Sequence, residues 1–190
     1  DTMEELFDHE IEGCFLYSRH WNPSNKYLSH ALAAMESTES AQVTSSGMSA
    51  IACTLMQLCG QGDEIIASRT IYGGTYALLK NFLPRMGITT HFVNLQDPAA
   101  IEAVRNENTR VIYGESMSNP LLHIADIPAL SNIAQKHNLK LVIDNTFSPM
   151  IISPARLGAD VVVHSLTKFV NGTSDCVAGA ICGSKAFIND

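Results

Sequence analysis

The sequence predicts an α/β fold, a mostly parallel sheet of about seven strands with helices on both faces. Short apolar runs rich in β-branched residues alternate with helix-type patterns along the 190 residues. The segments between them have ordinary loop lengths, which suits parallel strands joined by right-handed crossovers. Several apolar runs are followed directly by small or polar residues. That pattern is typical of open sheets that bind ligands at the carboxyl ends of their strands.

The stretch Val161–Lys168 shows this pattern most clearly. Three successive valines predict a strand buried on both faces, and the run turns polar at Ser165, Thr167 and Lys168. A lysine held at a strand end is a candidate Schiff-base nucleophile, because burial lowers the pKa of an amine. The two hydroxyls beside it are suited to binding a phosphate. A surface lysine after a core strand is the competing interpretation.

The first third of the chain predicts a second ligand-binding turn. Ser24 is expected to cap a helix that ends near Met35, and residues 41–44 predict a short strand. Small residues at 44–50 then lead into an apolar helix. Free backbone N–H groups at the start of that helix predict an anion site. A tight turn capped by serines is the alternative, since the segment matches neither a Walker loop nor GxGxxG.

The middle of the chain continues the alternation of strands and helices. Residues 64–67 predict a strand, and Tyr72 lies in the loop that follows it, directly before two glycines. This position suits an aromatic ring that lies over a planar ligand, although packing on the start of the next helix is the alternative. Further strands are expected at 90–93, 110–115 and 139–144, and helices through residue 82, at 98–104 and at 126–137.

The last part of the chain adds a carboxylate and a closing strand. Asp144 ends an apolar strand, where a charge is costly unless a cation lies beside it. The small residues of Val177–Cys182 predict a strand that is antiparallel and at an edge of the sheet. We find no domain boundary within the chain.

Composition narrows the classes of function. Lys and Arg total 12 against 19 Asp and Glu, and the formal net charge of −7 argues against nucleic-acid or anionic-membrane partners. No apolar run has the length of a membrane span, and no signal segment opens the chain. The cysteines are odd in number and lack a CxxC pair, which favours reduced, buried thiols in a cytoplasmic protein over disulfides or a metal site.

The groups at the strand ends together suit one cofactor. Pyridoxal 5′-phosphate requires a lysine for its aldehyde, a carboxylate for its pyridinium nitrogen, a stacking partner for its ring and donors for its phosphate. The candidates are Lys168, Asp144, Tyr72, the backbone of Ser46–Met48, and the hydroxyls of Ser165 and Thr167.

The chain resembles the pyridoxal-phosphate enzymes of Cys/Met metabolism, the fold-type I transsulfuration family. Within that family the similarity is greatest to the methionine γ-lyases, on residues 69–75, 81–85 and 144–150. The motifs that carry the family resemblance are Tyr17–Pro23, Ser45–Ile51, Tyr72–Thr75, Glu115 with Asn119–Pro120, Asp144–Phe147, Leu157–Asp160 and Val163–Lys168.

The resemblance implies an organisation for the whole protein. Residues 21–190 would form the pyridoxal-phosphate-binding large domain of the aspartate aminotransferase type (PLP-dependent transferase-like). That domain would be incomplete here, since the family's smaller C-terminal domain, with the arginine that holds the substrate carboxylate, is absent from this sequence. Residues 1–20 would be an arm that reaches a neighbouring subunit. The family pattern implies a homo-oligomer, a dimer of dimers with shared active sites.

The resemblance also implies a role for each site residue. Lys168 would bind the cofactor covalently and move protons, Asp144 would pair with the pyridinium nitrogen, and Tyr72 would stack on the ring and help protonate the leaving thiolate. No metal is implied. The further cofactor contacts would be Tyr17 and Arg19 toward a neighbouring subunit, with Ser46, Gly47, Met48, Glu115, Asn119, Thr146, Ser165 and Thr167.

The implied reaction is α,γ-elimination of L-methionine, an amino-acid substrate, to methanethiol, ammonia and 2-oxobutanoate. Many bacterial methionine γ-lyases have a cysteine where this chain has Gly74. This difference keeps cystathionine γ-lyase open as an alternative, together with γ-replacement of the O-acetylhomoserine sulfhydrylase or cystathionine γ-synthase type. A truncated cofactor-binding fragment without enzymatic activity is the remaining alternative.

Overall fold

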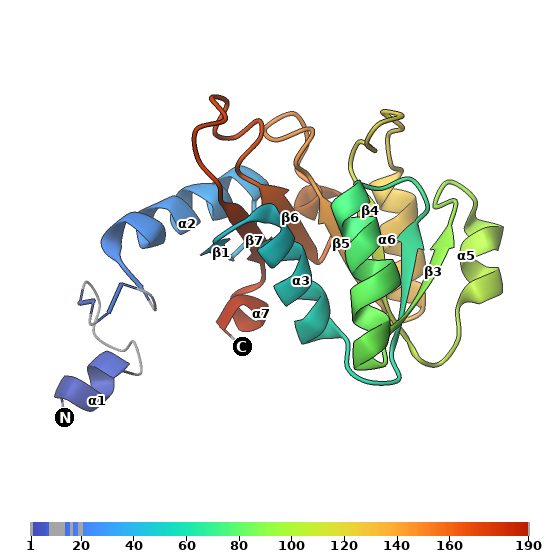
Figure 1. Ribbon diagram of the computed structural model, residues 1–190, viewed down its shortest axis with the longest axis horizontal. Helices are drawn as coiled ribbons and strands as arrows, with labels where there is room; N and C mark the ends of the chain where they lie inside the picture. The colour runs from blue at the N-terminus through green and yellow to red at the C-terminus, as the bar shows by residue number, and fades with distance from the viewer. Residues whose placement is uncertain (1, 8–13, 16, 19–20, 190) are drawn as a thin grey trace.

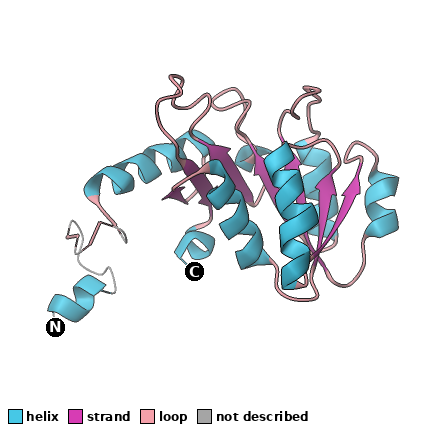
Figure 2. Ribbon diagram, in the orientation of Figure 1, coloured by secondary structure: helices cyan, strands magenta, loops and turns pink. Residues whose placement is uncertain are grey.

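The computed structural model describes residues 2–7, 14–15, 17–18 and 21–189, and it confirms the predicted α/β fold (Figures 1 and 2). Seven strands of this part of the chain form one sheet. They lie close to the predicted runs because β-branched and apolar residues suit a pleated, buried surface. The strands are β1 (Ser40–Thr44), β2 (Glu64–Ser68), β3 (Thr89–Val93), β4 (Thr109–Glu115), β5 (Lys140–Asp144), β6 (Val161–Ser165) and β7 (Gly179–Gly183).

The helices also follow their sequence signals, with one correction at a helix start. The predicted cap Ser24 is wrong, because helix α2 begins at Pro23 and the side chain of Asn22 accepts a hydrogen bond from Asn25 N at 2.8 Å. An asparagine before a proline supplies both the acceptor and a fixed φ for the first helical position. The elements are α1 (Thr2–Phe7), α2 (Pro23–Glu36), α3 (Gly47–Leu58), α4 (Gly73–Ala77), the π-helical turn η1 (Leu78–Phe82), the 3₁₀ turns η2 (Leu83–Met86) and η3 (Ala155–Leu157), α5 (Pro98–Val104), α6 (Ile127–Lys136) and α7 (Lys185–Asn189).

The strand order is β1-β7-β6-β5-β4-β2-β3, and β7 is the one described strand that runs against its neighbours. The predicted antiparallel direction of this strand is confirmed, but its predicted place at an edge is wrong. It pairs with β1 on one side and with β6 on the other, so that β1 is the edge strand. Its small residues permit this central place, since a side chain at Gly179 would collide with the backbone oxygen of Ser46.

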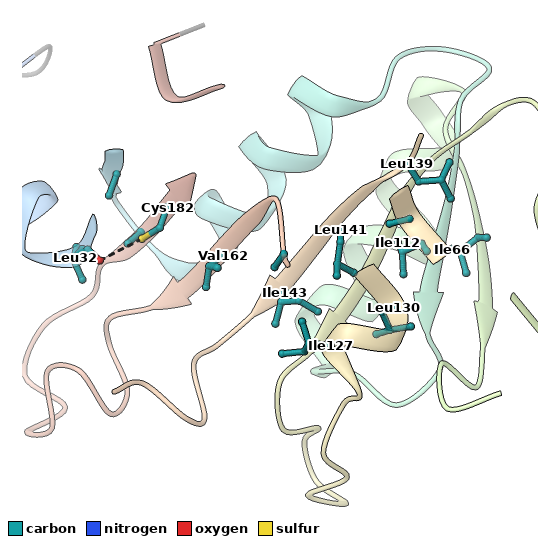
Figure 3. Close-up of a cluster of buried hydrophobic side chains, with 14 of the residues drawn as sticks. Leu32, Ile66, Ile112, Ile127, Leu130, Leu139, Leu141, Ile143, Val162 and Cys182 are labelled. Atoms are coloured by element: carbon teal, nitrogen blue, oxygen red, sulfur yellow. Dashed lines mark hydrogen bonds between the residues drawn. The ribbon is translucent and has the colours of Figure 1, made fainter. Parts of the chain in front are cut away.

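Two apolar layers cover the sheet. Side chains of α2, α5 and α6 pack on one face, and those of α3 and of the helical segment 73–86 pack on the other. Figure 1 shows α3 in front of the sheet and α6 behind it. Figure 3 shows the α2–α6 layer, in which Leu32, Leu130, Ile143, Val162 and Cys182 are buried together. Burial of this apolar surface on both faces is what fixes the strands and their ends in place.

The cysteines are free, as predicted. The prediction that they are buried is correct for two of them and wrong for the other three. Cys59 and Cys182 are buried, and burial raises the pKa of the Cys59 thiol to about 12. Cys14, Cys53 and Cys176 are exposed because they lie between α1 and α2, on the outer side of α3 and in the loop before β7, respectively. Across the described ranges, no group of three or more His, Cys, Asp or Glu is placed to hold a metal ion. Nor is any helix in them long and apolar enough to cross a membrane.

The loops that leave the carboxyl ends of the strands gather at one edge of the sheet. Figure 1 shows the loops after β4, β5 and β6 projecting together at the top of the molecule. The turn from β1 to α3 lies at the same edge, because β1 and β6 each run antiparallel to β7 and therefore parallel to each other. This convergence brings the chemistry-bearing segments of the sequence into one place.

Candidate cofactor site

A cavity of about 630 Å³ opens at this edge of the sheet. Its volume falls in the range of small-molecule sites, about 300–1,000 Å³. Every residue from Ser46 onward that the sequence suggested for the cofactor lies in its wall. These residues are Ser46, Gly47, Met48, Tyr72, Glu115, Asn119, Asp144, Thr146, Ser165, Thr167 and Lys168.

The structure describes one of the two suggested arm residues. Tyr17 is 57% exposed and does not line the cavity of its own chain. Arg19 lies outside the described residues. The phosphate contacts suggested for this pair therefore remain predictions.

The start of helix α3 supplies one wall of the cavity. Ser46 and Ser49 form a capping box, in which each side chain accepts a hydrogen bond from the backbone N–H of the other, at 3.0 and 2.9 Å. The N–H groups of Gly47 and Met48, in the same first turn, have no acceptor within the helix. Two backbone donors at the positive end of a helix thus border the cavity, as the anion-site prediction requires.

Gly47 allows this helix start to approach strand β6 closely. A side-chain carbon at Gly47 would lie 2.5 Å from Cβ and 2.9 Å from Oγ of Ser165. The Ser165 hydroxyl consequently lies beside the two backbone donors, although Ser165 follows them by more than a hundred residues in the chain. The structure thus brings the two motifs together at one place in the cavity wall, and their binding of a phosphate stays a prediction.

The turn after β6 carries Thr167 and Lys168. The Thr167 hydroxyl contacts the backbone of Ala178, accepting from its N–H at 3.2 Å and approaching its carbonyl oxygen at 3.3 Å. Lys168 lines the cavity but its side chain is exposed, so the prediction that this lysine is buried is wrong for the described chain. The reason is its place on the turn beyond the strand, where the cavity opens to solvent.

Asp144 lies at the inner end of the cavity and is 8% exposed. Its Oδ1 accepts hydrogen bonds from the N–H of Thr146 at 2.9 Å and from the hydroxyl of Thr146 at 2.6 Å. Burial raises the pKa of the Asp144 carboxyl, and the hydrogen bonds from Thr146 partly offset this effect. No described lysine or arginine forms an ion pair with Asp144. The carboxylate is therefore suited to a cationic N–H of a bound ligand.

One carboxylate in the cavity wall, that of Glu115, links the backbones of Tyr72 and Asn119. Glu115 accepts a hydrogen bond from Tyr72 N at 2.7 Å through one oxygen and from Asn119 N at 2.9 Å through the other. Burial raises the pKa of Glu115 to about 7, against the lowering effect of these two bonds. Tyr72 is 48% exposed, and a side-chain carbon at Gly74 would lie 2.5 Å from Cε1 of its ring.

The cavity wall also contains an aromatic pair that the sequence reading did not single out. The rings of Phe147 and Phe169 lie with centroids 5.4 Å apart, and both residues line the cavity. Each directly follows a site motif, Asp144–Thr146 and Ser165–Lys168, so adjacency to those motifs was the available signal. The pair adds to the apolar part of the lining, to which Ile51, Met117 and Val177 also contribute.

The residues present fit pyridoxal 5′-phosphate. Asp144 is a buried carboxylate that lacks a cationic partner among the described residues, and the cup at Gly47 and Ser165 offers donors for an anion. Lys168 opens onto the same cavity, and Tyr72 borders it with an aromatic face. A planar ligand that carries a phosphate, a basic nitrogen and an aldehyde would find a partner for each group.

Comparison with known proteins agrees with this arrangement. The sequence matches the family described as "Cys/Met metabolism PLP-dependent enzyme" over residues 1–190. A methionine gamma-lyase of Arabidopsis thaliana is 49% identical to the chain and aligns with 100% of it and 44% of the relative. An O-acetyl-L-homoserine sulfhydrylase of Leptospira meyeri is 42% identical, over 90% of this chain and 39% of the relative.

A solved structure has the same fold at high similarity. The crystal structure assigned as an O-acetylhomoserine (thiol)-lyase of Campylobacter jejuni, which contains N′-pyridoxyl-lysine-5′-monophosphate, superposes with a TM-score of 0.91 at 35% identity. The match covers 97% of this chain and 46% of that one, so the chain spans about half the length of the relatives it matches. The chain belongs to the pyridoxal-phosphate-dependent enzyme family of Cys/Met metabolism.

Proposed function

We propose that the full-length protein is a carbon–sulfur lyase that catalyses α,γ-elimination of L-methionine. With one water, methionine would give methanethiol, ammonia and 2-oxobutanoate. The observation that carries the proposal is the convergence of Lys168, Asp144 and Tyr72 with the α3 donor cup in one cavity. The methionine gamma-lyase of Arabidopsis thaliana, 49% identical over the whole chain, supports this choice of reaction.

Each residue has a task that its surroundings suit. Bound pyridoxal phosphate supplies an electron sink that stabilises negative charge next to the amino-bearing carbon. Lys168 lines the cavity, where it would hold the cofactor covalently and move protons at the α and β carbons. Asp144 keeps the ring nitrogen protonated from the buried side.

The remaining wall residues hold and orient the bound molecules. The N–H groups of Gly47 and Met48 bind the phosphate together with the Ser165 hydroxyl. Tyr72 stacks on the ring and donates a proton to the departing thiolate, and Glu115 fixes its backbone. Residues 21–190 act as the cofactor-binding domain, and residues 1–20 as an arm toward a neighbouring subunit of a dimer of dimers.

A γ-replacement reaction is the second candidate. The sulfhydrylase of Leptospira meyeri is 42% identical to the chain, and a methionine gamma-lyase of Pseudomonas putida is 41% identical. Gly74 leaves the Tyr72 ring room that a larger residue would take. Both observations are compatible with a site that admits a second, sulfur-bearing substrate.

A substrate panel on the full-length protein tests the proposal. The substrates are L-methionine, L-cystathionine, and O-acetyl-L-homoserine with and without sulfide, with release of thiol and of 2-oxobutanoate measured separately. We expect both products from methionine in equal amounts. Rapid use of O-acetylhomoserine and sulfide without keto-acid release would instead establish the replacement reaction. A Lys168→Ala variant serves as the control for uncatalysed release.

A further inference from the structure

A buried polar cluster lies behind the candidate site, on the other face of the sheet. It consists of Glu36 at the end of α2, Asn145 directly after β5 and His164 within β6, and we refer to it as the Glu36 cluster. Glu36 and Asn145 are fully buried, and His164 is 1% exposed. Glu36 Oε1 accepts hydrogen bonds from His164 Nε2 at 2.7 Å and from Asn145 Nδ2 at 2.8 Å.

Stability alone does not account for this cluster. The second oxygen of Glu36 and Nδ1 of His164 are buried without a hydrogen-bond partner among the described residues. Burial of unpartnered polar atoms costs on the order of 1–3 kcal/mol each. Replacement of a buried ion pair by apolar residues of similar size is often neutral or stabilising. The apolar layer around Leu32 and Val162 would accept such residues.

The cluster is directly connected to the cavity wall through the backbone. Asn145 follows Asp144 and His164 precedes Ser165, and successive side chains of a strand point to opposite faces of the sheet. The neighbours of Asp144 and Ser165 in sequence therefore lie on the α2 side, while Asp144 and Ser165 themselves line the cavity. Glu36 holds both of these neighbours through one oxygen atom.

A matching link exists on the cavity side. The Thr146 hydroxyl donates to Asp144 Oδ1 and accepts from Ser165 N at 2.8 Å. The ends of β5 and β6 are thus tied together on both faces of the sheet, by Thr146 in front and by Glu36 behind.

We propose that the Glu36 cluster positions the cofactor site from behind, and that Glu36 is a positioning residue although it does not line the cavity. The cluster sets the separation of Asp144, which would meet the ring nitrogen, from Ser165, which would meet the phosphate. One rigid cofactor must make both contacts at once. A shift of one strand end relative to the other would therefore weaken the binding of the cofactor. The inference rests on the proposed cofactor placement, and it is independent of which substrate the protein uses.

The test compares variants that separate stability from positioning. Glu36→Met removes the acceptor, which leaves His164 Nε2 unpaired and Asn145 Nδ2 with its bond to Ile152 O alone. Glu36→Met/His164→Leu instead replaces the buried pair by apolar side chains. Glu36→Gln keeps an oxygen that can accept both bonds. Glu39→Gln is the matched control, because the same change is made on an exposed side chain three residues later. The readouts on the full-length protein are thermal unfolding without cofactor and the dissociation constant of pyridoxal phosphate from its visible absorbance.

We expect the double variant to unfold at or above the temperature of Glu36→Met, yet to bind the cofactor about 10-fold more weakly than wild type, or worse. Glu36→Gln and Glu39→Gln should stay within about 3-fold of wild type. Wild-type affinity in the folded double variant would overturn the proposal, since a structural role is restored by apolar packing. Affinity in Glu36→Gln as weak as in Glu36→Met would overturn it as well.

A further variant decides the question if the double variant does not fold. Asn145→Ala removes one arm of the cluster and leaves the bond between His164 and Glu36 intact. We expect this variant to fold and to bind the cofactor several-fold more weakly. Wild-type affinity in folded Asn145→Ala would overturn the proposal. Because the readout is cofactor binding, a protein inactive on methionine would leave this result unaffected.

Discussion

The carboxylate of Glu115 accepts a hydrogen bond of 2.7 Å from the backbone N–H of Tyr72, 43 residues earlier in the chain. Its other oxygen accepts from the N–H of Asn119. One buried side chain at the end of β4 therefore fixes the loop that carries Tyr72 and the loop that carries Asn119. The geometry of both loops depends on an acid whose pKa burial raises from 4.5 to about 7.

This pKa predicts a pH-dependent stability in the cofactor-free protein. Because the folded-state pKa is raised, the folded state keeps the Glu115 proton between about pH 4.5 and 7 while the unfolded state loses it. The free energy of unfolding should therefore fall as the pH rises through this window, by up to about 3 kcal/mol. Glu115→Gln mimics the protonated acid and removes this contribution. In urea unfolding at several pH values, we expect the variant to gain stability relative to wild type as the pH rises. A constant difference between the two proteins would contradict the prediction.

Lys168 should be the residue to which pyridoxal phosphate is attached. It opens onto the cavity beside Ser165 and Thr167, whereas Lys80 and Lys185 do not line it. Borohydride reduction of the holoprotein followed by peptide mapping should give one labelled peptide that contains Lys168. Lys168→Ala should give none. Recovery of the label on Lys80 or Lys185 would show that the assignment is wrong.

Asp144→Asn should reduce turnover by about 100-fold or more, because a neutral amide no longer stabilises the positive ring nitrogen. Asparagine keeps an oxygen that can accept the bonds from Thr146. Since burial raises the pKa of Asp144, the substitution should not lower the free energy of unfolding of the cofactor-free protein by more than about 1 kcal/mol. Steady-state kinetics and urea unfolding check the two parts. Near-normal turnover with the cofactor bound would mean that Asp144 is a structural cap.

Gly47→Ala should disturb the phosphate cup, because the added carbon would lie 2.5 Å from Cβ of Ser165. Overpacking of this kind typically costs about 1–3 kcal/mol, here in stability, in cofactor affinity or in both. Gly73→Ala is the matched control, since a carbon there meets nothing within 4 Å. Urea unfolding and the cofactor dissociation constant are the measurements. If the two variants had equal unfolding free energies and equal cofactor dissociation constants, the close approach of Gly47 to Ser165 would not be required for stability or for cofactor binding.

Arg19 and Lys168 should complement each other between subunits. If the arm reaches a neighbouring site, a mixed dimer of Arg19→Ala and Lys168→Ala chains contains one site with both residues intact. Partial activity should return when the two impaired proteins are mixed under exchange conditions. Arg19→Ala alone should weaken cofactor binding by about 1.5–3 kcal/mol, as expected for a hydrogen bond to a charged group. Exchange without recovery of activity would place the arm over its own chain's site.

The sequence predicted the elements whose signals are local. The β-branched run at Val161–Val163 and the Asp–Pro start of α5 define their own ends, because strand burial and helix capping depend on a few adjacent residues. Asp144 and Ser165 could be suggested for the same reason, since each ends an apolar strand. Asn22 could have been read as the cap of α2, because an asparagine before a proline is a known helix start.

Features that depend on distant partners could not be read in this way. The local sequence pattern of a strand of small residues is the same whether the strand lies at an edge of the sheet or between two other strands. β7 lies between β1 and β6. Glu36 has the sequence signature of an exposed helix end, yet it is buried against His164, 128 residues away. The exposure of Lys168 likewise depends on how the surrounding loops fold.

The position of β7 has a consequence for the order in which the protein takes shape. β1 is paired through β7 alone among the described strands, and the two are separated by most of the chain. During synthesis, residues 40–44 have no strand to pair with until residues 179–183 have left the ribosome. The strands from β2 to β6 can already pair with one another before that point. The closure of so long a loop is slow. The start of α3, which depends on β1, should therefore be completed late. A nascent chain that ends before residue 179 would expose the edge of β6 to aggregation and would lack its anion-binding turn.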